Sequence, residues 1–290
     1  MTTTNLSPNV PDPDHPSSTV SHEVERLPPE ILGEIVKVSA LSSLRQASIL
    51  ARVCNAFHSW TQPILLRTSF HFANQSWPLK SLQLSWFQQN GSHIRNLLWG
   101  AQTSSIDLLA SILEHCPNLE NLAVWVYAPT SNLPLIRPAL SKLRLRELSI
   151  NLLILFSTDS LGQEQAKDPM FRHITHLDVI IHKRNFLEWR QLVGLAYIPS
   201  LTHVALHKAT PTAGDGVLEH CKNLQVLVVL ELRPAAGPHE SSAEVMAKKL
   251  VEYTPEPHAR STYDWEAGAM GKTDFWIEAE EEIANRSQRK

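Results

Sequence analysis

Histidine and cysteine are the residues of this chain best suited to hold a metal ion, and its 290 residues include 14 histidines and three cysteines. The phrase Leu-Glu-His-Cys occurs twice, ending at Cys116 and at Cys221. Zinc sites use closely spaced ligands such as Cys-x-x-Cys or His-Glu-x-x-His, and the sequence contains neither. His173 and His176 are three residues apart on one expected strand, so they point to opposite faces of a sheet. The sequence therefore predicts no metal site and no cofactor.

Motifs that carry catalysis are missing from the sequence as well. It has no Gly-x-Ser-x-Gly elbow, no phosphate-binding glycine loop and no dinucleotide fingerprint. The net charge of −3 favours neither nucleic acid nor an anionic membrane. No apolar run approaches the roughly 18–20 residues of a membrane span, and no secretory signal pattern is present. We expect a protein without enzyme activity, nucleic-acid partner or membrane partner, located in the cytoplasm or nucleus.

The repeated phrase instead reflects an internal repeat. An apolar-x-x-apolar-x-apolar pattern begins at Ile94, Leu119, Leu145, Ile174, Leu201 and Leu224, at intervals of 23 to 29 residues. Leucine-rich repeats have periods of about 20–29 residues, and each unit buries its apolar side only by stacking on the next. Cys116 and Cys221 take equivalent places four units apart. That distance is about 19 Å at a strand spacing of about 4.8 Å, too far for a disulfide.

The repeat also indicates which side chains line the concave face of the stacked strands. In each strand the second and third apolar residues point inward, and their neighbours lie on the concave face. A concave strip with an aromatic residue and small neighbours is a plausible protein-binding face. We expect these residues to bind a target protein: Asn121, Trp125, Glu147, Asn151, His176, Asp178, His203 and His207. The polar loop at residues 157–170 is a second candidate, because long loops often carry function.

Four segments organise the chain. Residues 1–22 predict a disordered tail, because they are rich in Pro, Ser, Thr and Asp. Residues 23–69 predict a small helical domain, whose second helix runs from about Leu41 to Trp60 and is ended by Pro63. The repeats fill residues 70–233, with a first strand near Thr68–Phe72. Residues 234–290 predict a last repeat and a C-terminal helical cap.

Within the last segment we expect three elements. Glu244–Val251 predicts a short helix, and a strand is expected near His258–Ser261. A helix through Ala284 follows, with Asp and Glu early and Arg and Lys late, which suits the helix dipole. Terminal repeats expose a core edge, and we expect this segment to cover it.

The helical domain opens with Leu27-Pro28-Pro29-Glu30-Ile31-Leu32 and closes with Arg52-Val53-Cys54-Asn55-Ala56-Phe57, followed by Trp60, Pro63, Leu65, Arg67 and Thr68. These residues resemble an F-box, which starts with Leu-Pro-x-Glu-Ile/Leu-Leu and ends with Val-Cys-x-x-Phe/Trp and Pro-x-Leu-(aromatic/Leu)-Arg. The resemblance implies binding to the adaptor subunit of a cullin–RING ubiquitin ligase. A small bundle has few internal places for so many apolar groups, which also suggests a partner helix. The expected adaptor contacts are Leu27, Pro28, Ile31, Leu32, Ile35, Val53, Phe57 and Trp60.

Residues 23–288 as a whole resemble fungal F-box-like proteins with degenerate leucine-rich repeats. The resemblance is carried by Ile94-Arg-Asn-Leu-Leu-Trp, Leu148-Ser-Ile-Asn-Leu, Thr175-His-Leu-Asp, and Asp264-Trp-Glu-x-Gly-Ala followed by Asp274-Phe275-Trp276. We expect an α+β fold in which an F-box-like helical bundle precedes a curved leucine-rich-repeat-like α/β solenoid with a parallel sheet.

These observations predict a substrate-recognition subunit of a cullin–RING ubiquitin ligase, whose helices bind the adaptor and whose repeats bind a target protein. The alternative is a stand-alone protein-binding scaffold in which the F-box-like helices are the N-terminal cap. The exposure of Leu27, Ile31 and Ile35 distinguishes the two. An adaptor surface leaves these side chains free, whereas a cap buries them against residues 70–100.

Overall fold

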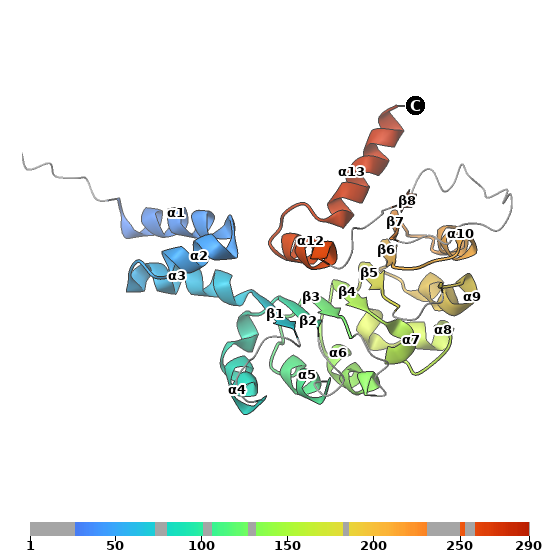
Figure 1. Cartoon of the computed structure of the whole chain (residues 1–290), viewed down its shortest axis with the longest axis horizontal. Helices are drawn as coiled ribbons and strands as arrows, with labels where there is room; N and C mark the ends of the chain where they lie inside the picture. The colour runs from blue at the N-terminus through green and yellow to red at the C-terminus, as the bar shows by residue number, and fades with distance from the viewer. Residues whose placement is uncertain are drawn as a thin grey trace, which may run out of the picture.

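The computed structural model describes residues 27–72, 80–100, 106–126, 132–181, 186–230, 250–252 and 259–289. The tail predicted at residues 1–22 lies outside these ranges. The fold is α+β, with three N-terminal helices, an open parallel sheet built from strand–helix units, and two C-terminal helices (Figure 1). Among the described residues, no helix combines the length and apolar character needed to cross a membrane.

The N-terminal bundle contains α1 (Pro29–Leu41), α2 (Leu44–Leu50) and α3 (Asn55–Leu66). Proline at the first position of α1 costs no hydrogen bond, because that N–H would be unpaired. The side chain of Ser43 caps α2 by accepting from the Gln46 amide. The predicted single helix from Leu41 to Trp60 is wrong, since residues 51–54 form a turn between α2 and α3. Pro63 lies inside α3, which continues to Leu66.

Eight parallel strands follow in sequential order, and every strand is paired with the next one in the chain. They are β1 (Thr68–Phe72), β2 (Asn96–Gly100), β3 (Asn121–Val124), β4 (Glu147–Ile150), β5 (His176–Val179), β6 (His203–Leu206), β7 (Val226–Val229) and β8 (Leu250–Glu252). One row across the sheet joins Asn96, Asn121, Glu147, His176, His203 and Val226. The register predicted from the repeat is therefore confirmed.

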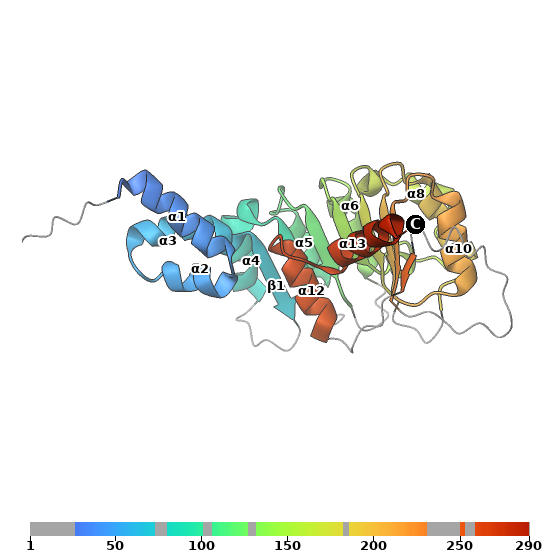
Figure 2. The same cartoon turned by 90° about the horizontal axis from the view of Figure 1, so that it is seen from above.

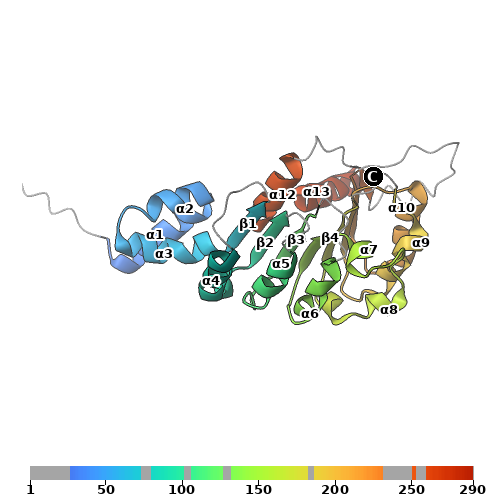
Figure 3. The same ribbon diagram turned by 60° about the horizontal axis from the view of Figure 1, so that its bottom comes forward.

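Helices and short 3-10 turns cover the convex face of the sheet (Figures 1 and 3). The helices are α4 (Lys80–Asn90), α5 (Ile106–Leu113), α6 (Arg137–Leu140), α7 (Leu152–Leu155), α8 (Gln163–Ala166), α9 (Trp189–Leu192) and α10 (Pro211–His220). The 3-10 turns are η1 (Gly91–His93), η3 (Leu133–Ile136), η4 (Pro169–Phe171) and η5 (Val193–Tyr197). The main core lies between these elements and the sheet.

The two cysteines of the repeated phrase belong to this core. Cys116 and Cys221 are buried free thiols, and burial raises the pKa of each to about 12. Each precedes the strand of its own unit, as the repeat predicts. They are structural residues with little thiolate at neutral pH.

The C-terminal helices α12 (Ala259–Ala269) and α13 (Phe275–Gln288) lie on the concave face of the sheet (Figures 1 and 2). The expected strand near His258–Ser261 is wrong from Ala259 onward, where α12 begins. The helix expected at Glu244–Val251 is wrong at its end, where β8 begins, and its earlier part lies outside the described residues. Trp265 and Ala269, four residues apart, give α12 an apolar face that packs on the sheet.

A tight turn joins the two helices. Gly271 has φ +69°, a left-handed conformation that glycine adopts readily. The amide of Lys272 donates to the Ala267 carbonyl at 2.8 Å and closes the end of α12. The Asp274 side chain then caps α13 by accepting from the Ile277 amide at 3.0 Å. This turn directs both helices along the concave face. The sequence predicts a cover for the edge of the last repeat, and the helices instead pack across several units.

Candidate functional site

The outer face of α1 carries an apolar stripe that nothing in the described chain covers. Ile31, Ile35 and Val38 follow helical spacing along this face and are 51%, 50% and 68% exposed. The opposite face carries Gly33, Val36 and Ala40, which are buried in the bundle. Seven of the eleven large apolar side chains exposed among the described residues lie between Leu27 and Val53, so this exposure is concentrated in the bundle.

The structure divides the eight predicted adaptor contacts into two groups. Leu27, Pro28, Ile31, Ile35 and Val53 are exposed, whereas Leu32, Phe57 and Trp60 are half-buried. Val38, Leu41 and Ile49, which are not among the predicted contacts, are exposed as well.

The half-buried aromatic residues hold the bundle together. The Trp60 ring lies on Gly33, where an added Cβ would meet the ring at 3.4 Å. Phe57 and Trp60 are in ring contact with centroids 5.7 Å apart. The Trp60 ring thus packs α3 against the buried face of α1, opposite the exposed stripe.

The concave face is the second candidate surface, and here the outcome differs from expectation. Seven of the eight predicted target contacts lie on this face, and α12 and α13 cover much of it, whereas Asn151 caps α7 by accepting from the Ile154 amide. Trp125, Asn151, Asp178 and His203 are buried, and the other four are half-buried: Asn121, Glu147, His176 and His207. The physical reason is the apolar character of the strip. Leu98, Ala123 and Val228 would be exposed on the sheet without the helices that pack on them.

A hydrogen-bond network crosses four strands beneath α12 and α13. The Trp125 indole N–H donates to Ser149 Oγ at 2.8 Å, and the Ser149 hydroxyl donates to Asp178 Oδ2 at 2.5 Å. His207 Nε2 lies 3.1 Å from Asp178 Oδ1. Burial alone would lower the pKa of His207, but the Asp178 carboxylate raises it overall. Asp178 and His207 are thus paired beneath the C-terminal helices.

A second network ties α12 to the start of the sheet. Asn96 Nδ2 lies 3.0 Å from the Ala269 carbonyl oxygen and 3.0 Å from Thr68 Oγ1. Asn121 Nδ2 donates to Asn96 Oδ1 at 2.9 Å. Trp265 packs edge-on against Phe70, with ring centroids 5.6 Å apart. Helix α12 is therefore fixed to the first strands of the sheet.

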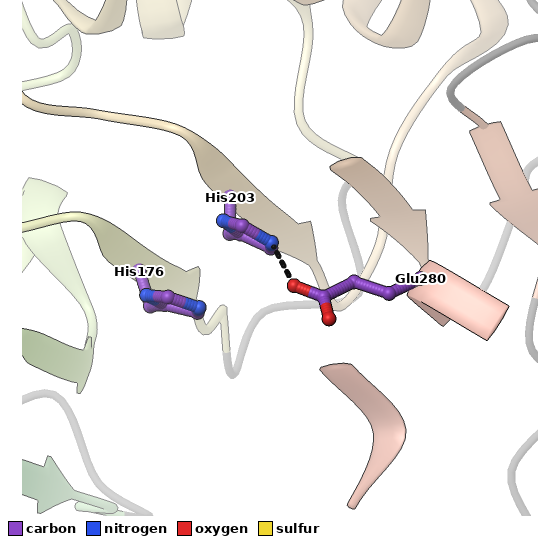
Figure 4. A group of neighbouring side chains, drawn as sticks. All are labelled: His176, His203 and Glu280. Carbon is purple, nitrogen blue, oxygen red and sulfur yellow. Dashed lines mark hydrogen bonds and ion pairs between the residues drawn. The ribbon is translucent and has the colours of Figure 1, made fainter. Parts of the chain in front are cut away.

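The third group joins β5, β6 and α13 (Figure 4). The rings of His176 and His203 are stacked, with centroids 4.0 Å apart and 12° between their planes. His203 Nε2 lies 2.8 Å from Glu280 Oε1. Trp276 stands edge-on to both rings, and its indole N–H donates to Glu147 Oε1 at 3.1 Å. Two histidines and one carboxylate thus meet at the edge of α13.

The ionisation of these groups follows from their burial. Burial, assisted by the neighbouring His203, lowers the pKa of His176 to about 3. Burial also lowers the pKa of His203, although Glu280 opposes the shift. Burial raises the pKa of Glu147 to about 7. The two imidazoles are therefore neutral at physiological pH.

The histidines that lie together are His176 and His203, and not the pair His173 and His176 considered in the sequence. The signal was present, because His176 and His203 occupy the same row in consecutive units, each preceded by threonine. Glu280 carried no such signal, since it comes from a helix 77 residues after His203.

The loop at residues 157–170 offers a weaker surface. An open hollow beside it is lined by Asp159, Ser160, Arg190 and Gln191, all polar residues. The loop itself contains the short helix α8, which accounts for the longest interval between units. The residues that line this hollow include no apolar side chain to anchor a partner, so it is a weaker candidate for protein binding than the stripe on α1.

Compared with known protein families and with curated proteins, the chain matches no family model and no curated sequence.

Proposed function

We propose that this protein is a substrate-recognition subunit of an F-box-type cullin–RING ubiquitin ligase. The observation that supports the proposal most is the apolar stripe on the outer face of α1. Leu27, Ile31 and Ile35 are 54%, 51% and 50% exposed, so none of them is buried against the described part of residues 70–100. An adaptor-binding surface requires these side chains to be exposed, whereas an N-terminal cap would bury them.

The energetics favour a partner at this stripe. Complete burial of one Val, Leu or Ile side chain contributes about 1.5–3 kcal/mol, and these side chains are about half exposed. Burial of the three stripe residues Ile31, Ile35 and Val38 would therefore contribute about 2–4 kcal/mol to association. Helices with apolar residues at this spacing bind in apolar grooves of helical partners. The adaptor subunit, as implied by the F-box resemblance, is a partner of this kind.

The binding experiment uses the full chain and a purified adaptor subunit. We expect Ile31→Asp with Ile35→Asp to weaken adaptor binding by about 100-fold, because two charges would enter an apolar interface. The double change Leu27→Ala, Pro28→Ala tests the start of the stripe. The matched control is Glu34→Gln with Lys37→Gln, since these residues pair with each other on the same helix. It should leave binding within about twofold.

A melting experiment separates loss of binding from loss of folding. The mutated side chains are exposed, so the melting temperature of each variant should stay near that of the wild-type chain. A wild-type chain that does not bind the adaptor, or a stripe variant that binds as well as the control, would overturn the proposal.

The repeats would supply target recognition, as leucine-rich repeats do by presenting a curved surface. Because α12 and α13 occupy the concave face, we propose that a target binds there only when these helices move, or binds the outer surface that they present. Trp276→Ala should distinguish the routes, because it loosens α13. Stronger target binding in this variant supports the first route, and weaker binding supports the second.

The alternative is a stand-alone scaffold with the helices as a cap. It is favoured by the direct continuation of α3 into β1, where the Arg67 carbonyl accepts from the amides of Arg95 and Asn96. Under this alternative, deletion of residues 1–66 should destabilise the sheet and remove no partner. Affinity purification with the intact chain and with this deletion distinguishes the two functions, because only the ligase subunit should lose a partner when the helices are removed.

A further inference from the structure

We propose that His176, His203 and Glu280 bind one divalent transition-metal ion of the zinc type, and that this ion fastens α13 to the sheet. The candidate ligand atoms of the three residues all lie within 4.8 Å of one another. They come from β5, β6 and α13, and Figure 4 shows both imidazole rings facing the same side, toward the carboxylate. The inference does not depend on adaptor binding by the N-terminal helices.

The donor set selects the class of metal. Two imidazole nitrogens and one carboxylate oxygen form a ligand set that proteins use for Zn²⁺, with water in the fourth position. Mg²⁺ and Ca²⁺ prefer oxygen ligands, so two nitrogen donors disfavour them. The exposed side of Glu280 leaves room for the water ligand.

The geometry needs only a small adjustment. When three atoms are no more than 4.8 Å apart, some point lies within about 2.8 Å of all of them, and zinc bonds to nitrogen and oxygen are about 2.0–2.2 Å. The stacked rings must each rotate about the Cβ–Cγ bond to direct their Nε2 lone pairs at one point. The Glu280 side chain is half-exposed and free to follow.

Threonine hydroxyls place the ring nitrogens in the required tautomer. Nδ1 of His176 lies 2.8 Å from Thr175 Oγ1, and Nδ1 of His203 lies 2.8 Å from Thr202 Oγ1. Each hydroxyl also donates to a main-chain carbonyl, that of Arg146 for Thr175 and that of Thr175 for Thr202. A hydroxyl committed to a carbonyl accepts the Nδ1 proton, which leaves the lone pair on Nε2. Outer partners of this kind orient histidine ligands in metal sites.

This tautomer creates a need for positive charge beside Glu280. The Nε2 lone pair of His203 then faces a carboxylate oxygen at 2.8 Å, and two acceptors at that distance repel each other. A proton or a metal ion between them removes the repulsion. A metal ion can also bind the Nε2 lone pair of His176. A proton shared by His203 and Glu280 leaves that lone pair without a partner.

Binding would couple to the position of α13. Two ligands belong to adjacent strands and the third to a helix 77 residues later, so the complete ligand set exists only when α13 is docked. An ion that binds only the docked form stabilises that form by mass action. Zinc should therefore raise the melting temperature of the chain and protect α13 from proteolysis.

Calorimetric titration of the full chain with ZnCl₂ tests the site, and we expect one ion per chain. His176→Ala and His203→Ala should each weaken binding by about 100-fold, and Thr202→Val by about tenfold. Glu280→Gln is nearly isosteric and half-exposed, so it should fold normally while binding zinc about tenfold more weakly. The control His93→Ala removes an exposed histidine far from α13 in the chain and should change binding by less than twofold.

Two results would overturn the proposal. The first is no zinc binding by the wild-type chain up to millimolar concentration. The second is unchanged affinity in both Glu280→Gln and His203→Ala, which would place the ion elsewhere and leave a hydrogen-bonded pair at this position. Melting experiments add a further test. Zinc should raise the melting temperature of His93→Ala as it does for the wild type, but not that of Glu280→Gln.

Discussion

At the scale of single residues, Asp178 is the buried acceptor at the centre of the hydrogen-bond network on the concave face. It receives the hydroxyl of Ser149 and pairs with His207, while Ser149 holds the indole of Trp125. Asp178 was predicted as a target contact because of its position on the concave face. Its burial indicates a structural role, since a buried carboxylate must be paired and hydrogen-bonded.

Replacement of Asp178 tests this role. Asp178→Ala should lower the free energy of unfolding by about 3–5 kcal/mol, because it leaves His207 and Ser149 without their buried acceptor. Urea unfolding at pH 7 measures the change. The control Asp159→Ala removes an exposed carboxylate and should stay within about 0.5 kcal/mol of the wild type. An equal effect of the two substitutions would contradict the structural role.

His71 predicts a dependence of stability on pH. It is buried between the rings of Phe87 and Trp99, and burial lowers its pKa from 6.5 to about 4. Between pH 6.5 and 4 the unfolded chain binds a proton here that the folded chain does not. Stability therefore falls as the pH is lowered through this window, by about 3 kcal/mol from this group, and the loss is complete below pH 4.

Unfolding in urea at several pH values checks this expectation for His71. The variant His71→Gln retains a polar group near Ser69 but cannot be protonated. Its stability should fall less steeply than that of the wild type between pH 6.5 and 4, and the two slopes should agree above pH 7. Identical slopes throughout would show that His71 has no part in the acid response.

At the scale of elements, the turn between α12 and α13 depends on one glycine. Gly271 has φ +69°, and an added Cβ would meet no other atom within 4 Å. The cost of Gly271→Ala is therefore conformational, about 1 kcal/mol. Thermal unfolding measures it, and Gly271→Asn should cost less because asparagine tolerates this conformation. A full-sized loss with asparagine would indicate a different cause.

The elements also show what the sequence could predict. The strands and their register were predictable because each unit repeats the same apolar spacing and bonds to its neighbours in the chain. The concave position of His176 and His203 follows from that register. The placement of α12 was not predictable, because Trp265 clusters with Phe70, Leu98 and Ala123. These residues are far from Trp265 in the sequence, and no repeating pattern links them to it. Glu280 was missed for the same reason.

At the scale of the whole molecule, the C-terminal helices connect the two ends of the sheet. A sheet in sequential order has contacts mainly between adjacent units, so its ends can unfold separately. Here α12 contacts the first strands through Trp265 and Asn96, while α13 lies against β7 and β8. The helices therefore bridge the first and last units and should make unfolding cooperative.

Trp265→Ala tests this cooperativity. It removes a large buried side chain, so we expect a loss of about 3–5 kcal/mol. We also expect the unfolding curves from tryptophan fluorescence and from far-UV circular dichroism, which coincide for the wild type, to separate in the variant. The comparison variant Tyr197→Ala removes an exposed aromatic residue and should keep the curves coincident. Coincident curves in Trp265→Ala would show that the sheet is cooperative without the bridge.

The bridge has a consequence during synthesis of the chain. The apolar residues Leu98, Ala123 and Trp125 emerge from the ribosome early, whereas Trp265, which covers them, is made at least 140 residues later. At about 5–20 residues per second, the concave face stays open for about 7–28 s while the remaining units are added. During that interval the nascent chain displays a curved apolar strip to any chaperone or neighbouring polypeptide. The exposure ends when the finished chain is released and α12 and α13 pack on the strip.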